Sequence, residues 1–554
     1  MKIFLTLLFN ILLTVNSFSQ KPVFTKSADS IAVFDFVEIS ITAKVPEKIN
    51  PFTQVTVQAE FNIDNEKVFV NGFCDAQDGS VYKLRYMPQK PGTYHYAITW
   101  RGNGKTVTSK NTFTAYAGNK KGPVEVDINY PTHFIYSGNK EHYFWSGTTA
   151  YWMLGWKDDT IIEQAIDRFS KYDINRIRVA INGRAHGGNR WNENTVVESD
   201  GFTFKLNPWT AKRPDDLDDP GFDVTRFNIS HWQKLDRLIL HAREKGIIVS
   251  LIFYVDGLDH GCDPFKKENM GNADELRYYE YAAARYGAYA NIMWDIANEY
   301  HLFRTVEWAE KMGPYLKQQD AGKHMISVHG SSNFPFRKAP WVDCVMYQSW
   351  DECGGYDFMM NNRRLQESSG KLMPQINEEY GYEGHYPVWG CGAVATKEKN
   401  FREGKYRSQL AWEMYMTGSY QTTGETAFYG TGAGENTGGG WINGRGNHKM
   451  TMLRYYQIIK NCFEQTEYWK LKPDPVAANT GNMLLSNQAK EYLLYTRLHY
   501  ARISLTKGEH YSVKMIDPET GEEFILPDAN TSDGSWQYPK ELNAPRVFIL
   551  KRKD

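Results

Sequence analysis

Short runs of alternating apolar and polar residues dominate the chain from residue 21 to about residue 120. In VEISITAKV, QVTVQAEFNI and TYHYAITW, β-branched or aromatic residues tend to recur at every second position, which is the period of a half-buried strand. Turn-forming stretches such as DAQDGS and QKPG separate these runs. Several short strands at close intervals predict a small β-sandwich over residues 21–120.

The pattern changes over residues 125–470, where apolar runs alternate with amphipathic helical stretches. In ISHWQKLDRLILHAREKG, Trp232, Leu235 and Leu238 share one helical face, and Gly246 marks the helix end. Eight strand candidates occur, most preceded by a helix: HYFWSGTTAYW, NRIRVAING, IIVSLIFYVDG, NIMWDIANEY, HMISVHGS, DCVMYQSW, LMPQINEEYGYEG and GSYQTTGETAF. This alternation predicts a parallel sheet, and eight units predict a (β/α)8 TIM barrel.

Two stretches depart from this rhythm. SSNFPFRKAPWV, between the fifth and sixth strands, is too short for a full crossover helix, and residues 183–228 form a long insertion after the second strand. Its HGGNRWNEN and RPDDLDDPG are typical of loop, and loops on that face usually build the substrate site. From about residue 471 strands return, which predicts a small C-terminal β-sandwich over residues 471–554. We expect it to brace the barrel, because no sugar-binding signature is visible.

The first 20 residues, MKIFLTLLFNILLTVNSFSQ, carry a lysine, then an apolar stretch, then small and polar residues. This is the order of a secretory signal peptide, and we expect cleavage near Ser19 or Gln20. The apolar part is too short and too interrupted for a membrane span, and no other segment qualifies. The expected location of the mature protein is therefore periplasmic or secreted.

Composition narrows the range of partners and cofactors. The net charge is -1 and no basic block occurs, so nucleic acid is not an expected partner. The six cysteines lack CxxC spacing, which argues against zinc, although one disulfide among Cys344, Cys353 and Cys391 would suit an oxidising compartment. Aromatic residues make up 14% of the chain, which fits stacking on sugar rings as well as an aromatic core.

The first candidate catalytic residues lie in NIMWDIANEY, where an apolar strand ends on Asn298 and Glu299. A strand that leaves a core must become polar somewhere, so this ending alone is equally consistent with a structural role. The seventh strand, LMPQINEEYGYEG, also ends on acids, Glu378 and Glu379. Because barrel strands end at one mouth, carboxylates from strands four and seven would face the same pocket. Glycoside hydrolysis needs such a pair, one to protonate the leaving oxygen and one at the anomeric carbon.

WDIANEY resembles the Asn-Glu signature of the retaining glycosidases of clan A, which are (β/α)8 barrels. The resemblance implies that Glu299 is the acid/base, that Asn298 holds the sugar 2-hydroxyl, and that a glutamate ending strand seven is the nucleophile. The order of sandwich, barrel and C-terminal β-domain, with FWSGTTAYWML and INEEYGYEG, is similar to the apiosidase-like secreted bacterial glycosidases. In such enzymes an Ig-like module often precedes the barrel, and YKLRYMPQKPGTYHYAITW resembles it. The similarity does not identify the sugar.

Strand seven offers two adjacent nucleophile candidates. Successive strand residues point to opposite faces, so we expect only one of Glu378 and Glu379 to reach the mouth. The apiosidase-like pattern, an acid followed shortly by Tyr-x-Tyr-Glu, aligns its nucleophile with Glu379, which we therefore choose.

Other strand ends supply candidate substrate-binding residues. By resemblance to the clan, Arg178 on strand two orients the nucleophile and keeps it ionised, and Tyr347 on strand six hydrogen-bonds it. A structural ion pair is the alternative for Arg178. The remaining candidates are Gln348, Trp350, His329, Asn182, Asp256 and Trp441. A buried structural histidine and a loop-anchoring tryptophan are the alternatives for His329 and Trp441.

These patterns predict a retaining glycoside hydrolase that acts on a carbohydrate without a cofactor or metal ion. A non-catalytic carbohydrate-binding or scaffold protein on the same barrel is the first alternative, against which Glu299 and Glu379 argue. A metal-dependent barrel hydrolase is the second, and FWSGTTAYW lacks the His-x-His that such barrels usually carry on strand one. The sugar, the linkage, exo or endo action and the oligomeric state stay open.

Overall fold

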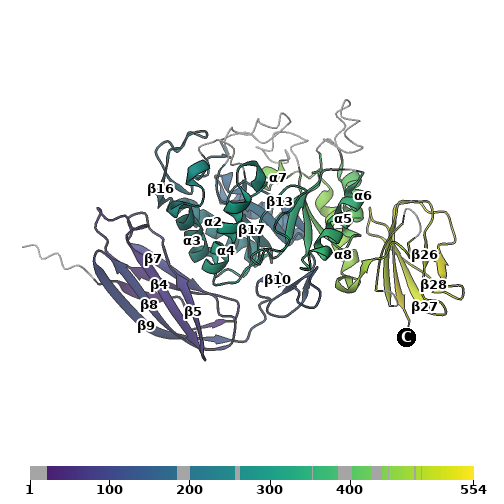
Figure 1. The fold of residues 1–554 in the computed structure, drawn as a ribbon, viewed down its shortest axis with the longest axis horizontal. Coiled ribbons are helices and arrows are strands. Elements are labelled where there is room, and N and C mark those ends of the chain that lie inside the picture. The colour runs from purple at the N-terminus through teal and green to yellow at the C-terminus, as the bar shows by residue number, and fades with distance from the viewer. Residues whose placement is uncertain are drawn as a thin grey trace, which may run out of the picture.

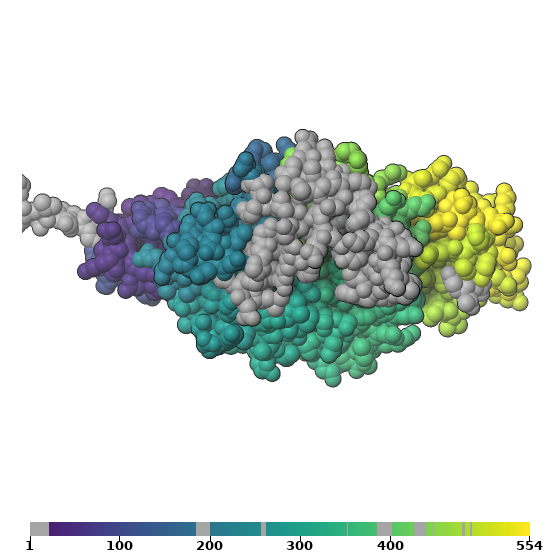
Figure 2. Space-filling model, turned by 90° about the horizontal axis from the view of Figure 1, so that it is seen from above, coloured from purple at the N-terminus to yellow at the C-terminus, as the bar shows by residue number. Residues whose placement is uncertain are grey.

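The computed structural model describes residues 21–183, 200–255, 262–351, 353–384, 402–425, 439–446, 448–478, 482–487 and 490–553. Within these ranges the chain forms an N-terminal sandwich, a central barrel and a C-terminal sandwich, which lie side by side along the long axis (Figure 1). Seen from above, the two sandwiches lie at opposite ends of the barrel (Figure 2). The predicted fold class is confirmed, whereas the predicted signal peptide lies outside the described residues. None of the described helices is long and apolar enough to cross a membrane.

Two sheets build the N-terminal sandwich. One has the strand order β1-β3-β7-β6 and the other the order β2-β9-β8-β4-β5. Their bounds are β1 Val23–Lys26, β2 Ser30–Ala32, β3 Val37–Thr42, β4 Thr56–Ile63, β5 Glu66–Asn71, β6 Phe73–Cys74, β7 Val81–Tyr86, β8 Gly92–Gly102 and β9 Lys105–Tyr116. In β3 the predicted alternation holds, because Val37, Ile39 and Ile41 are buried between the sheets while the residues between them are only half-buried or exposed.

Eight parallel strands form the barrel, in the order β19-β18-β17-β14-β13-β22-β21-β20. A parallel bridge between His329 and Met346 links the two ends of this order. In chain order the strands are β13 Gly147–Thr149, β14 Arg176–Ala180, β17 Ile248–Ile252, β18 Ile292–Asp295, β19 Ile326–Ser327, β20 Val345–Gln348, β21 Gln375–Glu379 and β22 Tyr420–Thr423. Each is short and fully or almost fully buried, as expected for a barrel covered by helices.

Helices surround this ring. They are α1 Asp159–Lys171, α2 Ile229–Glu244, α3 Ala273–Tyr286, α4 Val306–Gln319, α5 Gly355–Ser368, α6 Gly404–Tyr415, α7 Gly440–Asn443 and α8 Met452–Phe463, with 3-10 turns η1 Met153–Gly155, η3 Lys267–Asn269, η4 Tyr300–Leu302 and η6 Tyr468–Lys470. As predicted, the connection from β19 to β20, which the structure describes throughout, contains no helix.

The described part of the insertion after β14 contains the antiparallel hairpin of β15 Trp209–Ala211 and β16 Phe222–Phe227, two strands that we did not predict. RPDDLDDPG is the loop between these strands, as predicted, and HGGNRWNEN lies outside the described residues. Trp209 anchors the hairpin, because its buried ring packs on Phe265 and Tyr278. A second small sheet, of β10 Val124–Val126, β11 Phe134–Tyr136 and β12 His142–Tyr143, precedes the barrel.

The C-terminal sandwich shares a core with the barrel. Its strands are β23 Lys472–Pro473, β24 Asn482–Ser486, β25 Glu491–Thr496, β26 Arg502–Ser504, β27 His510–Ile516, β28 Glu523–Asn530, β29 Ser535–Gln537 and β30 Arg546–Arg552. Leu493, Tyr495 and Val547 belong to the same buried apolar cluster as the barrel core. Trp412 of α6 stacks on Tyr495, with ring centroids 5.5 Å apart. This continuity favours the predicted bracing role.

Buried charge joins the N-terminal sandwich to the barrel. Arg85 of β7 contacts Glu38 of its own sheet at 2.8 Å and Asp236 of α2 at 3.2 Å. Arg285 of α3 binds Asp236 through two nitrogens, at 2.9 and 2.7 Å, and contacts Asp75 at 2.9 Å. Asp236 is therefore shared by two arginines, one from each domain.

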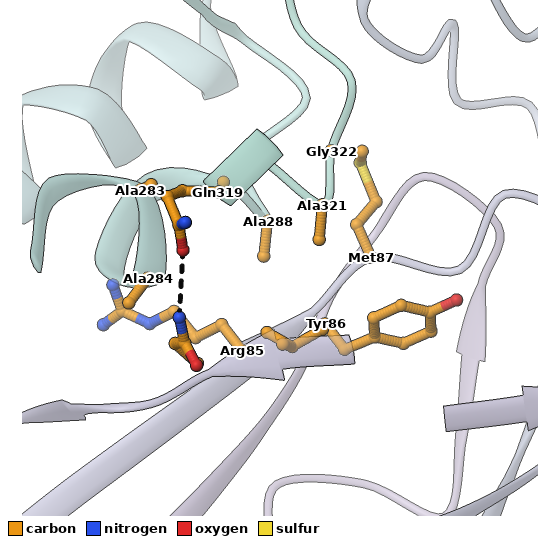
Figure 3. Close-up of a pocket in the computed structure, with 12 residues that line it drawn as sticks. Arg85, Tyr86, Met87, Ala283, Ala284, Ala288, Gln319, Ala321 and Gly322 are labelled. Atoms are coloured by element: carbon orange, nitrogen blue, oxygen red, sulfur yellow. Dashed lines mark hydrogen bonds between the residues drawn. The ribbon is translucent and has the colours of Figure 1, made fainter. Parts of the chain in front are cut away.

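Small side chains line the adjoining part of the interface between the N-terminal sandwich and the barrel. Figure 3 shows Arg85 and Met87 of the sandwich facing alanines of α3 and the end of α4, whereas the ring of Tyr86 points away from them. Asn71 of β5 donates a hydrogen bond to Gln319 of α4, at 3.1 Å. Close packing and polar contacts together fix the sandwich against the barrel.

Replacing Asp236 by alanine should destabilise the whole chain, because it leaves two buried guanidinium groups short of a counter-charge. We expect a loss of about 3 kcal/mol in the free energy of unfolding, measured as a lower urea midpoint by tryptophan fluorescence. Lys67→Ala is the control, since its ion pair with Glu60 is exposed and should contribute less than about 1 kcal/mol. Equal changes in the urea midpoint of the two variants would contradict a stabilising role for the buried ion pairs of Asp236.

Candidate active site

Strand β18 carries Asn298 and Glu299 to the C-terminal mouth of the barrel. The backbone of Glu299 is left-handed, with φ 46° and ψ 45°, a conformation that is uncommon for a residue with a Cβ and recurs at functional sites. Its Oε1 accepts a hydrogen bond from Nε2 of Gln348, at the end of β20, at 2.7 Å. Gln348 thus holds the Glu299 carboxyl group from a neighbouring part of the rim.

Glu379 ends β21, and its side chain is 10% exposed. Its Oε1 accepts hydrogen bonds from the hydroxyl group of Tyr151 and from Nη1 of Arg178, the latter at 3.3 Å. Burial and the carboxylate of Glu299 raise the pKa of Glu379 to about 7, while Arg178 and Tyr151 oppose the rise. Two repelling carboxylates of this kind hold one proton between them over an interval of pH.

Glu378 also points into the barrel, because β21 contains a bulge. In the register between β20 and β21, Tyr347 pairs with Asn377 and Gln348 pairs with Glu379, so Glu378 is skipped. A bulge of this kind breaks the strict alternation of strand side chains. Strict alternation, the reason given for expecting only one of the two glutamates at the mouth, therefore does not hold in β21.

The two glutamates nevertheless lie in different surroundings. Glu378 is fully buried, with its Oε2 2.6 Å from Nη1 of Arg176 and 3.5 Å from Nε of Arg178. Glu379 is the one that keeps some exposure and interacts with Glu299.

Arg178, from β14, connects the residues of the mouth. Its side chain is fully buried. In addition to Glu379, it donates from Nη2 to Oδ1 of Asn298 at 2.7 Å and from Nη1 to the hydroxyl oxygen of Tyr151 at 2.8 Å. His329, after β19, is hydrogen-bonded through Nδ1 to the same Asn298 oxygen. Burial and Arg178 hold the pKa of His329 well below its usual range, so its ring is neutral.

Tyr347 does not lie where the resemblance implied. Its hydroxyl group donates to Oε1 of Gln375 at 2.8 Å, and its ring packs on Phe358 of α5. The side chain faces the helix layer because it alternates with Gln348, which faces the mouth. The hydroxyl group on Glu379 comes instead from Tyr151, just beyond β13. The sequence held a signal for it, since Tyr151 stands at the end of the first strand, in FWSGTTAYW.

Aromatic rings form one wall of the mouth. Trp350, after β20, and Trp441, in α7, flank Tyr382, with ring centroids 5.3 and 5.9 Å from it. Trp441 also meets Tyr151 edge-on at 6.0 Å. Both tryptophans are half-buried, so part of each ring is accessible for contact with a ligand.

Two candidates contribute less. Asn182 is buried, and its Nδ2 donates a long hydrogen bond to the carbonyl oxygen of Cys262, at 3.4 Å. Asp256 lies outside the described residues. Within the part of the chain that the structure describes, no group of three or more His, Cys, Asp or Glu side chains could hold a metal ion.

Known proteins share this architecture. The chain matches the family model described as "Apiosidase-like, catalytic domain" over residues 132–470, and a domain of unknown function (DUF5060) over residues 30–101. Mannan endo-1,4-beta-mannosidase F of Aspergillus fumigatus is 22% identical over 339 residues, which are 52% of this chain and 71% of the relative.

Two solved structures from Bacteroides vulgatus share the fold. One, titled as a candidate glycoside hydrolase, aligns with a TM-score of 0.76 and 21% identity over 95% of this chain and 100% of its own. A glycoside hydrolase of family 5 aligns with a TM-score of 0.58 and 16% identity over 78% of this chain and 93% of its own.

The apiosidase-like match extends over more than half of the chain and includes the whole barrel, from β11 to the last helix. It also covers every residue that the structure brings together at the mouth. The chain therefore belongs to the apiosidase-like family and is a glycoside hydrolase.

Proposed function

We propose that the protein hydrolyses an O-glycosidic bond of an oligosaccharide or polysaccharide with retention of anomeric configuration, with Glu379 as the nucleophile and Glu299 as the acid/base. The observation that carries the proposal is a pair of carboxyl groups from different strands at one mouth, with Glu299 held by Gln348 and Glu379 held by Arg178 and Tyr151. A pair of carboxyl groups is what both steps of a double displacement require.

In the first step a Glu379 oxygen attacks the anomeric carbon as the bond to the leaving oxygen breaks. Glu299 gives its proton to that oxygen, and a covalent glycosyl ester of Glu379 forms. In the second step Glu299 takes a proton from water, the water oxygen attacks the anomeric carbon, and the Glu379 carboxylate leaves. Each step moves one proton through Glu299, so the residue returns to its starting state.

The surroundings support this division of roles. Arg178 and the Tyr151 hydroxyl group stabilise the ionised form of Glu379, whereas Gln348 donates an uncharged hydrogen bond to Glu299. The first step requires the two carboxyl groups in opposite charge states, an ionised Glu379 and a protonated Glu299. Strands β18 and β21 are three apart in the ring, and retention needs carboxyl groups about 5–5.5 Å apart rather than the 6.5–9.5 Å, roughly, of inverting enzymes.

The proposed substrate is a carbohydrate that stacks on the aromatic wall. Trp350 and Trp441 offer flat apolar surface of the kind that sugar rings cover. The family description and the curated relative concern apiosides and mannan respectively. A screen of plant and microbial glycans and of their aryl glycosides, read by released sugar, would identify the substrate.

We also propose that the mature protein works outside the cytoplasm. The signal-peptide pattern of residues 1–20 motivates this proposal. Cys353 is disulfide-bonded, which is typical of an oxidising compartment, whereas Cys344 is free and buried.

Glu379→Gly should lower the rate of hydrolysis by roughly 10³-fold or more, because no covalent intermediate can form. Azide should restore turnover of an activated aryl glycoside by entering the vacated space, and should give a glycosyl azide of inverted configuration, identified by proton NMR. Glu378→Gly is the matched control, and azide should not rescue it. Rescue of Glu378→Gly alone would move the nucleophile to that residue.

Glu299→Ala should slow substrates with poor leaving groups far more than activated aryl glycosides, which need little protonation. We expect a difference of about 10²-fold or more between the two classes, the usual size of general acid catalysis. The measurement is kcat/KM for a series of aryl glycosides of increasing leaving-group pKa. Glu307 is an exposed acid in the following helix. In Glu307→Ala the loss in kcat/KM should not depend on the leaving-group pKa. Equal losses on all substrates would remove Glu299 from the acid role.

Tyr151→Phe should raise the pKa of Glu379, because the hydroxyl group stabilises its ionised form. Since Glu379 must be ionised to attack, the acid limb of the kcat/KM profile should move to higher pH, with a rate loss of about 10-fold to 100-fold at low pH. Tyr347→Phe is the matched control, because its hydroxyl group lies against Gln375 and the helix layer. An identical shift in both variants would contradict the assignment of Tyr151.

A further inference from the structure

A layer of fully buried charge lies beneath the two glutamates of the mouth. Arg176 and Arg178 point into the barrel from alternate positions of β14. Three carboxyl groups face them, from Glu378, Glu379 and Asp295, the last residue of β18. The proposed reaction uses only Glu379, so Glu378 and Asp295 have another reason to be there.

Glu378 is the counter-ion of the two arginines, which lie 2.6 and 3.5 Å from its Oε2. Burial alone would raise its pKa, but Arg176 and Arg178 outweigh burial and hold the pKa of Glu378 below its usual range. When Glu379 is ionised, as its proposed attack requires, Glu378 and Glu379 balance the two guanidinium charges one for one. A further negative charge on Asp295 would leave the buried layer with a net charge that a low-dielectric interior disfavours.

The contacts of Asp295 suit a neutral carboxyl group. Its side chain is fully buried, and its Oδ2 lies 3.7 Å from Nη2 of Arg178, beyond hydrogen-bonding distance. Among the described residues neither carboxyl oxygen has a well-formed hydrogen bond, and the backbone N–H of His329 makes only a weak one that lowers the pKa of Asp295. Nη2 of Arg178 is turned to Oδ1 of Asn298 instead, at 2.7 Å. An ionised Asp295 would compete for this guanidinium group.

We propose that Asp295 is a positioning residue that keeps its proton in the working enzyme and thereby leaves Arg178 to Glu379 and Asn298. This inference rests on the proposed role of Glu379 as the nucleophile. Loss of the Asp295 proton at high pH draws the guanidinium group toward Asp295 and away from Glu379. Asp295 therefore sets an upper limit to the pH range in which the site is assembled.

The groups that face Asp295 come from three neighbouring parts of the barrel. They are Arg176 and Arg178 of β14, Glu378 of β21, and the backbone N–H of His329 after β19. Burial raises the pKa of Asp295 to about 7, and Glu378 adds to the rise, while Arg178, Arg176 and the backbone N–H of His329 oppose it.

The proposal fixes the sign of a pH effect on stability. The ordinary pKa of Asp295 is 3.8, against about 7 in the folded protein. Between these values the folded protein keeps a proton that the unfolded chain releases, so the Asp295 contribution to stability falls as pH rises through this window. Asn cannot ionise and has nearly the same shape. Asp295→Asn should therefore melt higher relative to wild type at pH 8 than at pH 5.

Melting of both proteins by differential scanning fluorimetry from pH 5 to pH 8 tests the protonation state without any substrate. If Asp295 is instead an ionised partner of Arg178, its pKa in the folded protein lies below its ordinary value of 3.8. The difference in melting temperature between variant and wild type should then stay constant from pH 5 to pH 8, and that result would overturn the proposal. Failure of the proposed function is a separate outcome, because it shows only in the assays of activity.

The positioning role is tested by the basic limb of the pH profile. In a Glu299→Ala background, with the dinitrophenyl glycoside of the sugar found by screening, ionisation of Glu299 does not contribute. There Asp295→Asn should raise the ratio of kcat/KM at pH 9 to that at pH 7 by about threefold or more, equivalent to about half a pKa unit. An unchanged ratio would overturn the proposal.

Glu275→Gln is the matched control for both measurements. Glu275 is another buried carboxyl group whose pKa burial raises, and it lies beside Tyr254 and Trp308, away from Arg178. Like Asp295→Asn, Glu275→Gln should have a higher melting temperature relative to wild type at pH 8 than at pH 5. It should leave the ratio of kcat/KM at pH 9 to that at pH 7 as in the parent, because no catalytic group depends on its charge.

Discussion

The guanidinium group of Arg178 is fully buried, and most of the active site is arranged around the need to offset its charge and satisfy its donors. Glu379, Asn298 and Tyr151 each accept a hydrogen bond from it, although they come from strands on different sides of the ring. One cation therefore fixes the relative positions of a carboxylate, an amide and a phenol. The same contact that orients Glu379 also favours its ionised form.

The barrel could be predicted from the sequence because its signal is repeated many times along the chain. Helical and strand periods alternate from residue 125 to residue 470, and an error in one unit does not change the fold that the others indicate. Glu299 could be found for the same reason, since a polar residue at the end of an apolar strand marks the mouth, whereas Arg178, in the middle of β14, was found by resemblance. The family resemblance then supplied roles that the pattern alone could not.

Features that depend on one local irregularity could not be predicted. The bulge in β21 turns Glu378 inward together with Glu379, and nothing in QINEEY marks a skipped position. Tyr347 was misplaced because a resemblance transfers a residue type without its face of the strand. The strands of the hairpin at Trp209 were not predicted, because a single buried tryptophan in a polar stretch gives no strand period.

The continuous core between the barrel and the C-terminal sandwich has an evolutionary consequence. Trp412 and Tyr495 complete each other's burial, and Asp236 is shared by arginines of the N-terminal sandwich and the barrel. A recombination event that exchanged either sandwich for an unrelated one would expose apolar surface or leave a buried charge without its partner. The three parts are therefore expected to be inherited together, so that specificity in this lineage changes through loops at the mouth rather than by shuffling of modules.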